Sequence, residues 1–206
     1  IRPTTESNIW NWSKEYRHIA PKTHTGLSGI AIESVDGGII EQVTFNNISM
    51  EGIITPIFIC LNHRRMNQHS GQSGIIRNLL FSNITAKAEG IIPTLIAGTP
   101  TGRITDITLR DITVEHAGGE KAMTKSLPEN LKGYPENRMY GKENPAGGLY
   151  IRHADNILIE NFHIRQRNTD ERPSIFLDDA TDIHIEKLQS TGSIAKKMIE
   201  HSKCSN

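Results

Sequence analysis

The chain has 206 residues, of which 36% are hydrophobic and 22% charged, enough apolar material for one globular domain or part of a larger one. Its 23 basic and 23 acidic residues give a formal charge of zero, which argues against a nucleic-acid partner. No stretch approaches the roughly 18 consecutive apolar residues of a membrane-spanning helix, so we expect no membrane partner. The first residues, IRPTTESN, show no apolar run of the signal-peptide kind.

Composition favours a β-rich chain. There are 30 isoleucines against 12 leucines and 3 valines, together with 17 threonines. Branching at Cβ suits a pleated surface and lowers helix propensity, so a helix bundle is largely excluded. An atypical N-terminal segment, residues 1–26, holds both tryptophans, Trp10 and Trp12, and shows little alternation.

Five short alternating runs then follow, and they resemble one another as the units of a repeat architecture do. In each run an apolar residue is followed five places later by another. The pairs are Val43 and Ile48, Leu79 and Ile84, Ile107 and Ile112, Ile157 and Phe162, and Ile183 and Leu188. The residue before the second apolar position is Asn47, Asn83, Asp111, Asn161 or, as the exception, Lys187. An amide or carboxylate at this fixed offset suits a tight turn or a side-chain ladder between stacked strands.

A second kind of strand precedes these runs and opens with Gly or Pro. These strands begin at Gly29, Pro56, Pro93, Gly148 and Pro173. The repeats are unequally spaced, which suits coils of two or three strands with loops of varied length at their corners. The longest excursion, residues 115–147, is rich in Gly, Pro and charge, and loops of this length are often functional or disordered. Residues 191–206 are expected to form a C-terminal tail.

The fold class that fits best is all-β, a right-handed parallel β-helix over residues 27–190 that is incomplete at its N-terminal end. Each coil cannot bury its apolar face alone, and stacking makes the core continuous. A β-sandwich or barrel is the alternative. Antiparallel hairpins would call for Asn-Gly or Asp-Gly turns, however, and only Asp36-Gly37 offers one.

Several blocks in order resemble glycoside hydrolase family 28, the polygalacturonase-like family of pectin-degrading enzymes, and most closely its bacterial branch. The blocks are SGIAIESVDGGIIEQVTFNNISMEGIITPIFICLNHR from Ser28, PENLKGYPENRMYG from Pro128, GLYIRHADNILIENF from Gly148 and DERPSIFLDDATDI from Asp170. The resemblance implies a pectin-lyase-like solenoid, inverting hydrolysis of glycosidic bonds, a pectin-like polysaccharide as partner and no cofactor. It also implies a secreted or periplasmic location.

One family motif is matched in position but not in chemistry. The family's catalytic aspartates lie in an Asn-Thr-Asp motif and a following Asp-Asp motif, and Gly-His-Gly and Arg-Ile-Lys motifs come after them. The last of these falls at Ala31, Ile32 and Glu33, which cannot bind a sugar carboxylate as Arg and Lys would. Specificity for galacturonate therefore stays open, beside specificity for a neutral or a differently substituted sugar. The motif order also implies that the catalytic aspartates lie upstream of Ile1, that this chain is the C-terminal part of the enzyme, and that it is inactive alone.

The sequence also spells both aspartate motifs literally, at Asn168-Thr169-Asp170 and at Asp178-Asp179. Asp170 and Asp178 are only eight residues apart, too few for one coil, and both follow the Ala31 position instead of preceding it. The structural interpretation, a turn with solvated or capping carboxylates, is favoured over catalysis by Asp170, Asp178 and Asp179.

Candidate substrate-binding residues lie where strands end and in the long excursion, since Arg and His donate to sugar oxygens and aromatic rings stack on sugars. They are His63, Arg64 and Arg65, Arg138 and Tyr140, and Arg152 and His153. No His-x-x-x-His or Cys-His cluster predicts a metal site. Two alternatives to hydrolysis stay open: a noncatalytic polysaccharide-binding β-helix, and a calcium-dependent polysaccharide lyase of the same architecture.

Overall fold

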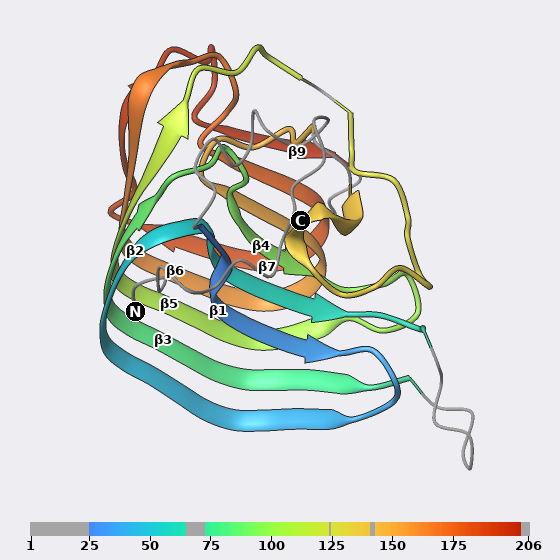
Figure 1. Ribbon diagram of the computed structural model, residues 1–206. Helices are drawn as coiled ribbons and strands as arrows, with labels where there is room; N and C mark the ends of the chain where they lie inside the picture. Colours follow the sequence, from blue (N-terminus) through green and yellow to red (C-terminus); the bar gives the residue numbers. More distant parts are fainter. Residues whose placement is uncertain (1–24, 65–72, 124, 141–142, 203–206) are drawn as a thin grey trace.

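The computed structural model describes residues 25–64, 73–123, 125–140 and 143–202 of the chain. These residues form a parallel β-helix in which each coil stacks on the next (Figure 1). The strands are β1 Gly26–Ser34, β2 Ile39–Leu61, β3 Ile75–Ala88, β4 Thr94–Ala97, β5 Ile104–Gly118, β6 Leu149–Asp170, β7 Ile175–Glu186, β8 Gln189–Ser193 and β9 Ile199–Ser202. One short 3-10 helix, η2, spans Asn137–Tyr140. The strand order β1-β2-β3-β5-β6-β7-β9, with β4 between β2 and β6, forms one continuous sheet wound into coils.

The predicted right-handed parallel β-helix is confirmed, and the ladder register confirms the alignment of the repeats. All ladders between the named strands are parallel. Residues that the sequence pattern placed in equivalent positions are direct neighbours across coils. One such column is Val43, Leu79, Ile107, Ile157 and Ile183, and a second is Ile48, Ile84, Ile112 and Phe162.

The coil corners adopt the left-handed backbone conformation that the Asn and Asp residues predict. Asn47, Asn83, Asp111 and Asn161 have φ between 52° and 59°. Short polar side chains tolerate this region because they bond locally to the backbone. Lys187, the exception in the pattern, has φ 53° as well, so its place in the coil imposes the bend on a residue that does not favour it. Some corner side chains bond between coils, as when Asn161 Nδ2 donates to Asp111 Oδ1 at 2.6 Å.

The interior of the coils is filled by stacked columns of β-branched residues. Ile57, Ile59, Ile107 and Ile159 belong to this cluster and are almost completely buried. Burying one such side chain contributes roughly 1.5–3 kcal/mol before the cost of ordering the chain is counted. The isoleucine-rich composition therefore follows from a core that repeats the same packing environment in every coil.

A second apolar cluster lies on the outer face of the strands β1, β4 and β7 and the matching parts of β2 and β6. Leu127, Tyr140 and Ala146 lie in residues 119–148, here called the covering loop (Figure 1, yellow to gold), and they cover this face. The outward residues beneath them are Phe58, Leu95, Tyr150 and Phe176. The covering loop is thus a packed layer over one wall of the solenoid.

Element bounds differ from the expected ones at three places. β5 continues to Gly118, so the excursion begins at residue 119 instead of 115. The expected tail contains strand residues, because β8 and β9 continue the helix past residue 190. The N-terminal segment lies outside the described residues except for the start of β1, which falls at Gly26.

His116, near the end of β5, is a fully buried titratable group in this core. Burial lowers its pKa to about 3, and the positive charge of nearby Arg172 acts in the same direction. In the unfolded chain a histidine binds its proton near pH 6.5. The unfolded state therefore holds more protons than the folded state between these values, and acidification favours unfolding.

We expect the free energy of unfolding to fall as the pH decreases from 6.5 to 5, a window above the titration of most carboxylates. His116→Asn should remove up to about 1.4 kcal/mol per pH unit from this dependence, which is the contribution of one proton. Urea unfolding of both proteins at pH 7, 6 and 5 measures the two slopes. Equal slopes would show that His116 does not carry the effect.

Candidate functional site

The register shows where the departed family motif lies. Ala31 and Glu33 are on the outer face of β1, and Glu33 begins a column that continues through Cys60, Ala97 and Arg152. Partial burial raises the pKa of Glu33, and the nearby carboxylate of Glu136 raises it further. Ile32 points toward the core cluster instead. The position at which the sequence resemblance places a carboxylate-binding lysine is therefore acidic here, and the first cation in its column lies three coils away.

That cation, Arg152, forms a buried cluster with His153, whose left-handed backbone makes the first corner within β6. Arg152 Nη1 donates to the carbonyl oxygens of Leu127 and Pro128 at 3.1 and 3.2 Å. Its Nη2 pairs with Glu129 of the covering loop. His153 Nε2 lies 2.8 Å from the same Glu129 oxygen, Oε1. Two sequence-predicted residues thus converge on one carboxylate oxygen.

Asp179 holds the other side of the His153 ring. His153 Nδ1 lies 2.6 Å from Asp179 Oδ2, and Arg103 Nη1 donates to the same oxygen at 2.8 Å. Partial burial acts to raise the pKa of Asp179, but the hydrogen bonds from His153 and Arg103 outweigh it and lower the pKa. The hydrogen bond to Asp155 raises the pKa of Arg103. Asp179 is therefore an anion fixed between two donors, and it orients the imidazole.

The two carboxylates on either side of His153 do not form an inverting acid and base pair. An inverting glycosidase keeps its carboxyl groups about 6.5–9.5 Å apart so that a sugar and a water fit between them. Here the imidazole of His153 fills the space between Glu129 and Asp179, with a hydrogen-bond contact to each. The arrangement binds and orients, and it leaves no place for the scissile bond.

Of the three literal-motif aspartates, only Asp179 reaches solvent, with 35% of its side chain exposed. Asp170 is 0% exposed and is paired at 2.9 Å with Arg172, which is 1% exposed. Asp178 is buried and accepts a hydrogen bond from Tyr150 at 2.8 Å. The partners of these three carboxylates do not overlap, so the literal motifs do not assemble one site.

The other predicted residues divide between this corner and the covering loop. His63 lies along the same row of corners, since its Nε2 is 2.8 Å from Thr99 Oγ1, and Gly98 beside Thr99 packs against the His153 carbonyl. Arg64 pairs with Asp36 and lies 5.9 Å from the centre of the Tyr134 ring. Arg138 pairs with Glu136 inside the loop, Tyr140 packs in the outer apolar cluster, and Arg65 lies outside the described residues.

Two functional residues were missed by the sequence reasoning. Glu129 lies within the quoted PENLKGYPENRMYG block, but nothing local shows that it reaches back to a strand 24 residues later. Arg103 follows a Gly in a turn, and its partners are more than 50 residues away. Only the stacking of coils brings them together.

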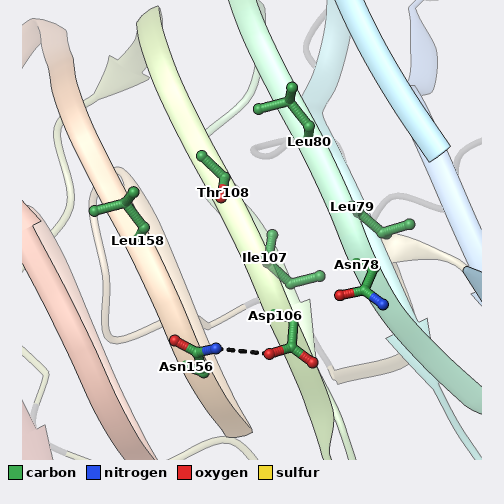
Figure 2. Close-up of a pocket in the computed structure, with 8 residues that line it drawn as sticks. All are labelled: Asn78, Leu79, Leu80, Asp106, Ile107, Thr108, Asn156 and Leu158. Atoms are coloured by element: carbon green, nitrogen blue, oxygen red, sulfur yellow. Dashed lines mark hydrogen bonds between the residues drawn. The ribbon is translucent and has the colours of Figure 1, made fainter. Parts of the chain in front are cut away.

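A shallow groove of about 420 Å³ lies on the outside of β3, β5 and β6 (Figure 2). Two rows cross the strands there. One row is Asn78, Asp106 and Asn156, and the other is Leu80, Thr108 and Leu158. Asn156 Nδ2 donates to Asp106 Oδ1 at 2.6 Å, which links neighbouring coils. The lining contains neither an aromatic nor a cationic side chain, so it offers amide and carboxylate oxygens beside aliphatic surface.

These features define a parallel β-helix with a row of polar corner residues, His63, Thr99, His153 and Asp179, and a shallow groove on its outer face. Residues 22–133, more than half of the chain, match the family model described as glycosyl hydrolases family 28. The chain belongs to this family and is of the polygalacturonase-type glycoside hydrolases. No curated protein and no solved structure matches it. Among the described residues there is no helix able to span a membrane and no group of three metal-ligating side chains.

The burial of the aspartates predicts unequal effects of their removal. Asp170→Asn leaves the Arg172 charge buried and unpaired, so we expect a loss of about 3–5 kcal/mol in the free energy of unfolding. Asp179→Asn, at a side chain in contact with solvent, should cost about 1 kcal/mol or less. Urea unfolding at pH 7 measures both variants. A larger loss for Asp179→Asn than for Asp170→Asn would contradict this assignment of structural and surface roles.

Proposed function

We propose that this chain contributes cleft-lining coils to an enzyme that hydrolyses pectin-like polysaccharides with inversion, and that the acid and base are aspartates outside these 206 residues. The observation that supports it most is the match of residues 22–133 to the family model, in a parallel β-helix whose literal-motif aspartates are bound to other partners. Neighbouring strands are about 4.7–4.9 Å apart. A glycan lying along the solenoid axis would therefore meet a new coil with roughly every sugar residue.

The corner row at the end of these strands supplies the proposed contacts. His63 and Thr99 come from two successive coils, and His153 and Asp179 from the next two. His63, Thr99 and His153 are buried and hydrogen-bonded, so the partly exposed carboxylate of Asp179 is the acceptor that this row offers to a sugar hydroxyl. The covering loop closes the middle of the sheet with apolar side chains, which leaves the corner row as the path for a sugar chain.

The absence of catalysis from this chain is supported by the state of its literal-motif aspartates. Asp170 and Asp178 are buried and bound, and Asp179 is held by two donors. A general acid must hold its proton near neutral pH, which calls for a raised pKa. The lowered pKa of Asp179 is the opposite condition.

We expect the purified chain to bind polygalacturonate in affinity electrophoresis and to release no reducing ends from polygalacturonate, rhamnogalacturonan or neutral glycans. His153→Ala should weaken binding at least tenfold. His184→Ala serves as the matched control, because His184 is an exposed histidine of β7 whose contact is with Glu186. Reducing-end release that Asp179→Asn abolishes would place a catalytic carboxylate in this chain. Unsaturated products that require added calcium would indicate a lyase.

A noncatalytic role in polysaccharide binding is the second candidate, and the groove of Figure 2 favours it. Its amide and carboxylate row and its aliphatic row repeat on successive coils, as the sugars of a linear glycan do. The carboxylate of Asp106 disfavours acidic sugars, so this groove suits a neutral glycan.

Substitution on the groove floor tests this role. Thr108→Arg fills the groove and should weaken binding of a neutral glycan at least tenfold. Thr113→Arg is the matched control, since Thr113 is a half-buried outward residue of the same strand beyond the next corner. Isothermal titration with soluble neutral oligosaccharides measures the affinities. Equal binding by the two variants would remove the groove as the binding surface.

A further inference from the structure

We propose that Arg152 and His153 form a binding site for a monovalent carboxylate, and that Glu129 of the covering loop fills this site as an internal ligand. The ligand class is a small carboxylic acid or the carboxylate of a sugar acid. The inference rests on the geometry of this corner and holds whether or not the chain takes part in hydrolysis. It extends the proposed function in one respect, since a sugar acid would compete with Glu129.

The donors of this site are fixed before any ligand arrives. The Arg152 side chain is only 3% exposed, and the carbonyl oxygens of Leu127 and Pro128 hold its Nη1. The ring of Tyr140 lies 5.9 Å from the guanidinium carbon, which restrains the other side. Arg152 therefore presents Nη2 in one direction, and an arginine fork matches the planar shape of a carboxylate.

His153 is fixed just as firmly. Asp179 accepts at Nδ1, and Arg103 in turn holds the Asp179 oxygen, so the imidazole is clamped from behind. This leaves Nε2 directed at the point that Arg152 Nη2 also faces, where Glu129 Oε1 lies. Because a carboxylate lies at each ring nitrogen, the imidazolium form can donate to both.

Glu129 is the exposed and separable member of the cluster. Its side chain is 43% exposed, whereas those of Arg152 and His153 are 3% and 9% exposed. It belongs to a stretch of the covering loop without strand or helix. A carboxylate from solution can take its place at two buried donors while the β-helix beneath stays unchanged.

The charges around the site select a monoanion. The arginines at this corner are Arg103 and Arg152, and the acidic groups that face them from the β-helix are Asp155, Asp178 and Asp179. Displacement of Glu129 removes one negative charge, so a monoanion restores the present charge, whereas a dianion such as phosphate would add a second negative charge.

The test uses replacement of the internal ligand. Glu129→Ala should lower the melting temperature, and acetate or galacturonate should restore it, whereas chloride or galactose at matched ionic strength should not. At a hundredfold excess over Kd, one site predicts a rise of about 5–10 °C. Wild type should need at least tenfold more acetate or galacturonate for the same rise, because Glu129 competes. Glu136→Ala is the matched control, since it removes a carboxylate of the same loop that pairs with Arg138.

A second variant keeps the test decisive if Glu129→Ala does not fold. Glu129→Gln retains the shape of the side chain with a weaker neutral acceptor, so galacturonate should bind it at least tenfold more tightly than it binds wild type in calorimetric titration. Equal affinities, or an acetate response of Glu136→Ala that matches Glu129→Ala, would overturn the proposal. Hydrolysis is not a readout, so failure here would leave the proposed enzymatic role standing.

Discussion

Parallel backbone ladders between coils are the interaction on which the rest of the molecule depends. They bring residues that are 23 to 55 positions apart into direct contact, with shifts of register at Glu51–Ile53 and at Arg165–Asp170. The bends that keep this register are left-handed corner residues, of which Asn47, Asn83, Asp111 and Asn161 are one column. The sites described above are built from the columns and corners of these stacked coils, and the covering loop adds Glu129 to one of them.

The ladders also explain how much the sequence predicts. Alternation and the fixed Asn or Asp before each second apolar position predicted the columns through Val43 and Ile48, because each coil presents the same environment. The end of β5 was not predicted, since residues 115–118 read as charged and Gly-rich, while His116 points into the core. The alternation of apolar and polar residues predicts burial only where the buried residues are apolar, and here the buried residue is His116.

The candidate site was predictable only in part, for a physical reason. Arg152 and His153 come directly after the short apolar run that begins at Gly148, so a local sequence pattern identified them, although both lie within β6. Glu129 belongs to the site because the covering loop folds back over the sheet, held by Leu127 and Tyr140 on an outward apolar face. This loop packs against the sheet at one place and is not repeated in other coils, so it leaves no periodic pattern in the sequence. The literal Asn-Thr-Asp motif shows the opposite case, in which a local pattern does not mark a site. Its Asp170 is buried in an ion pair with Arg172.

The outward column that begins at Glu33 changes its charge along the solenoid. Glu33 falls where the sequence resemblance places a lysine, and burial and the nearby carboxylate of Glu136 raise its pKa. Arg152 occupies the same outward column three coils later, with His153 beside it. Cys60 and Ala97, which lie between Glu33 and Arg152 in the column, are buried under the covering loop, so the two charged positions have separate surroundings. In the site that we propose, the position of Arg152 along the solenoid sets where a carboxylate would bind, and Glu129 of the covering loop sets whether that cation is open to solvent.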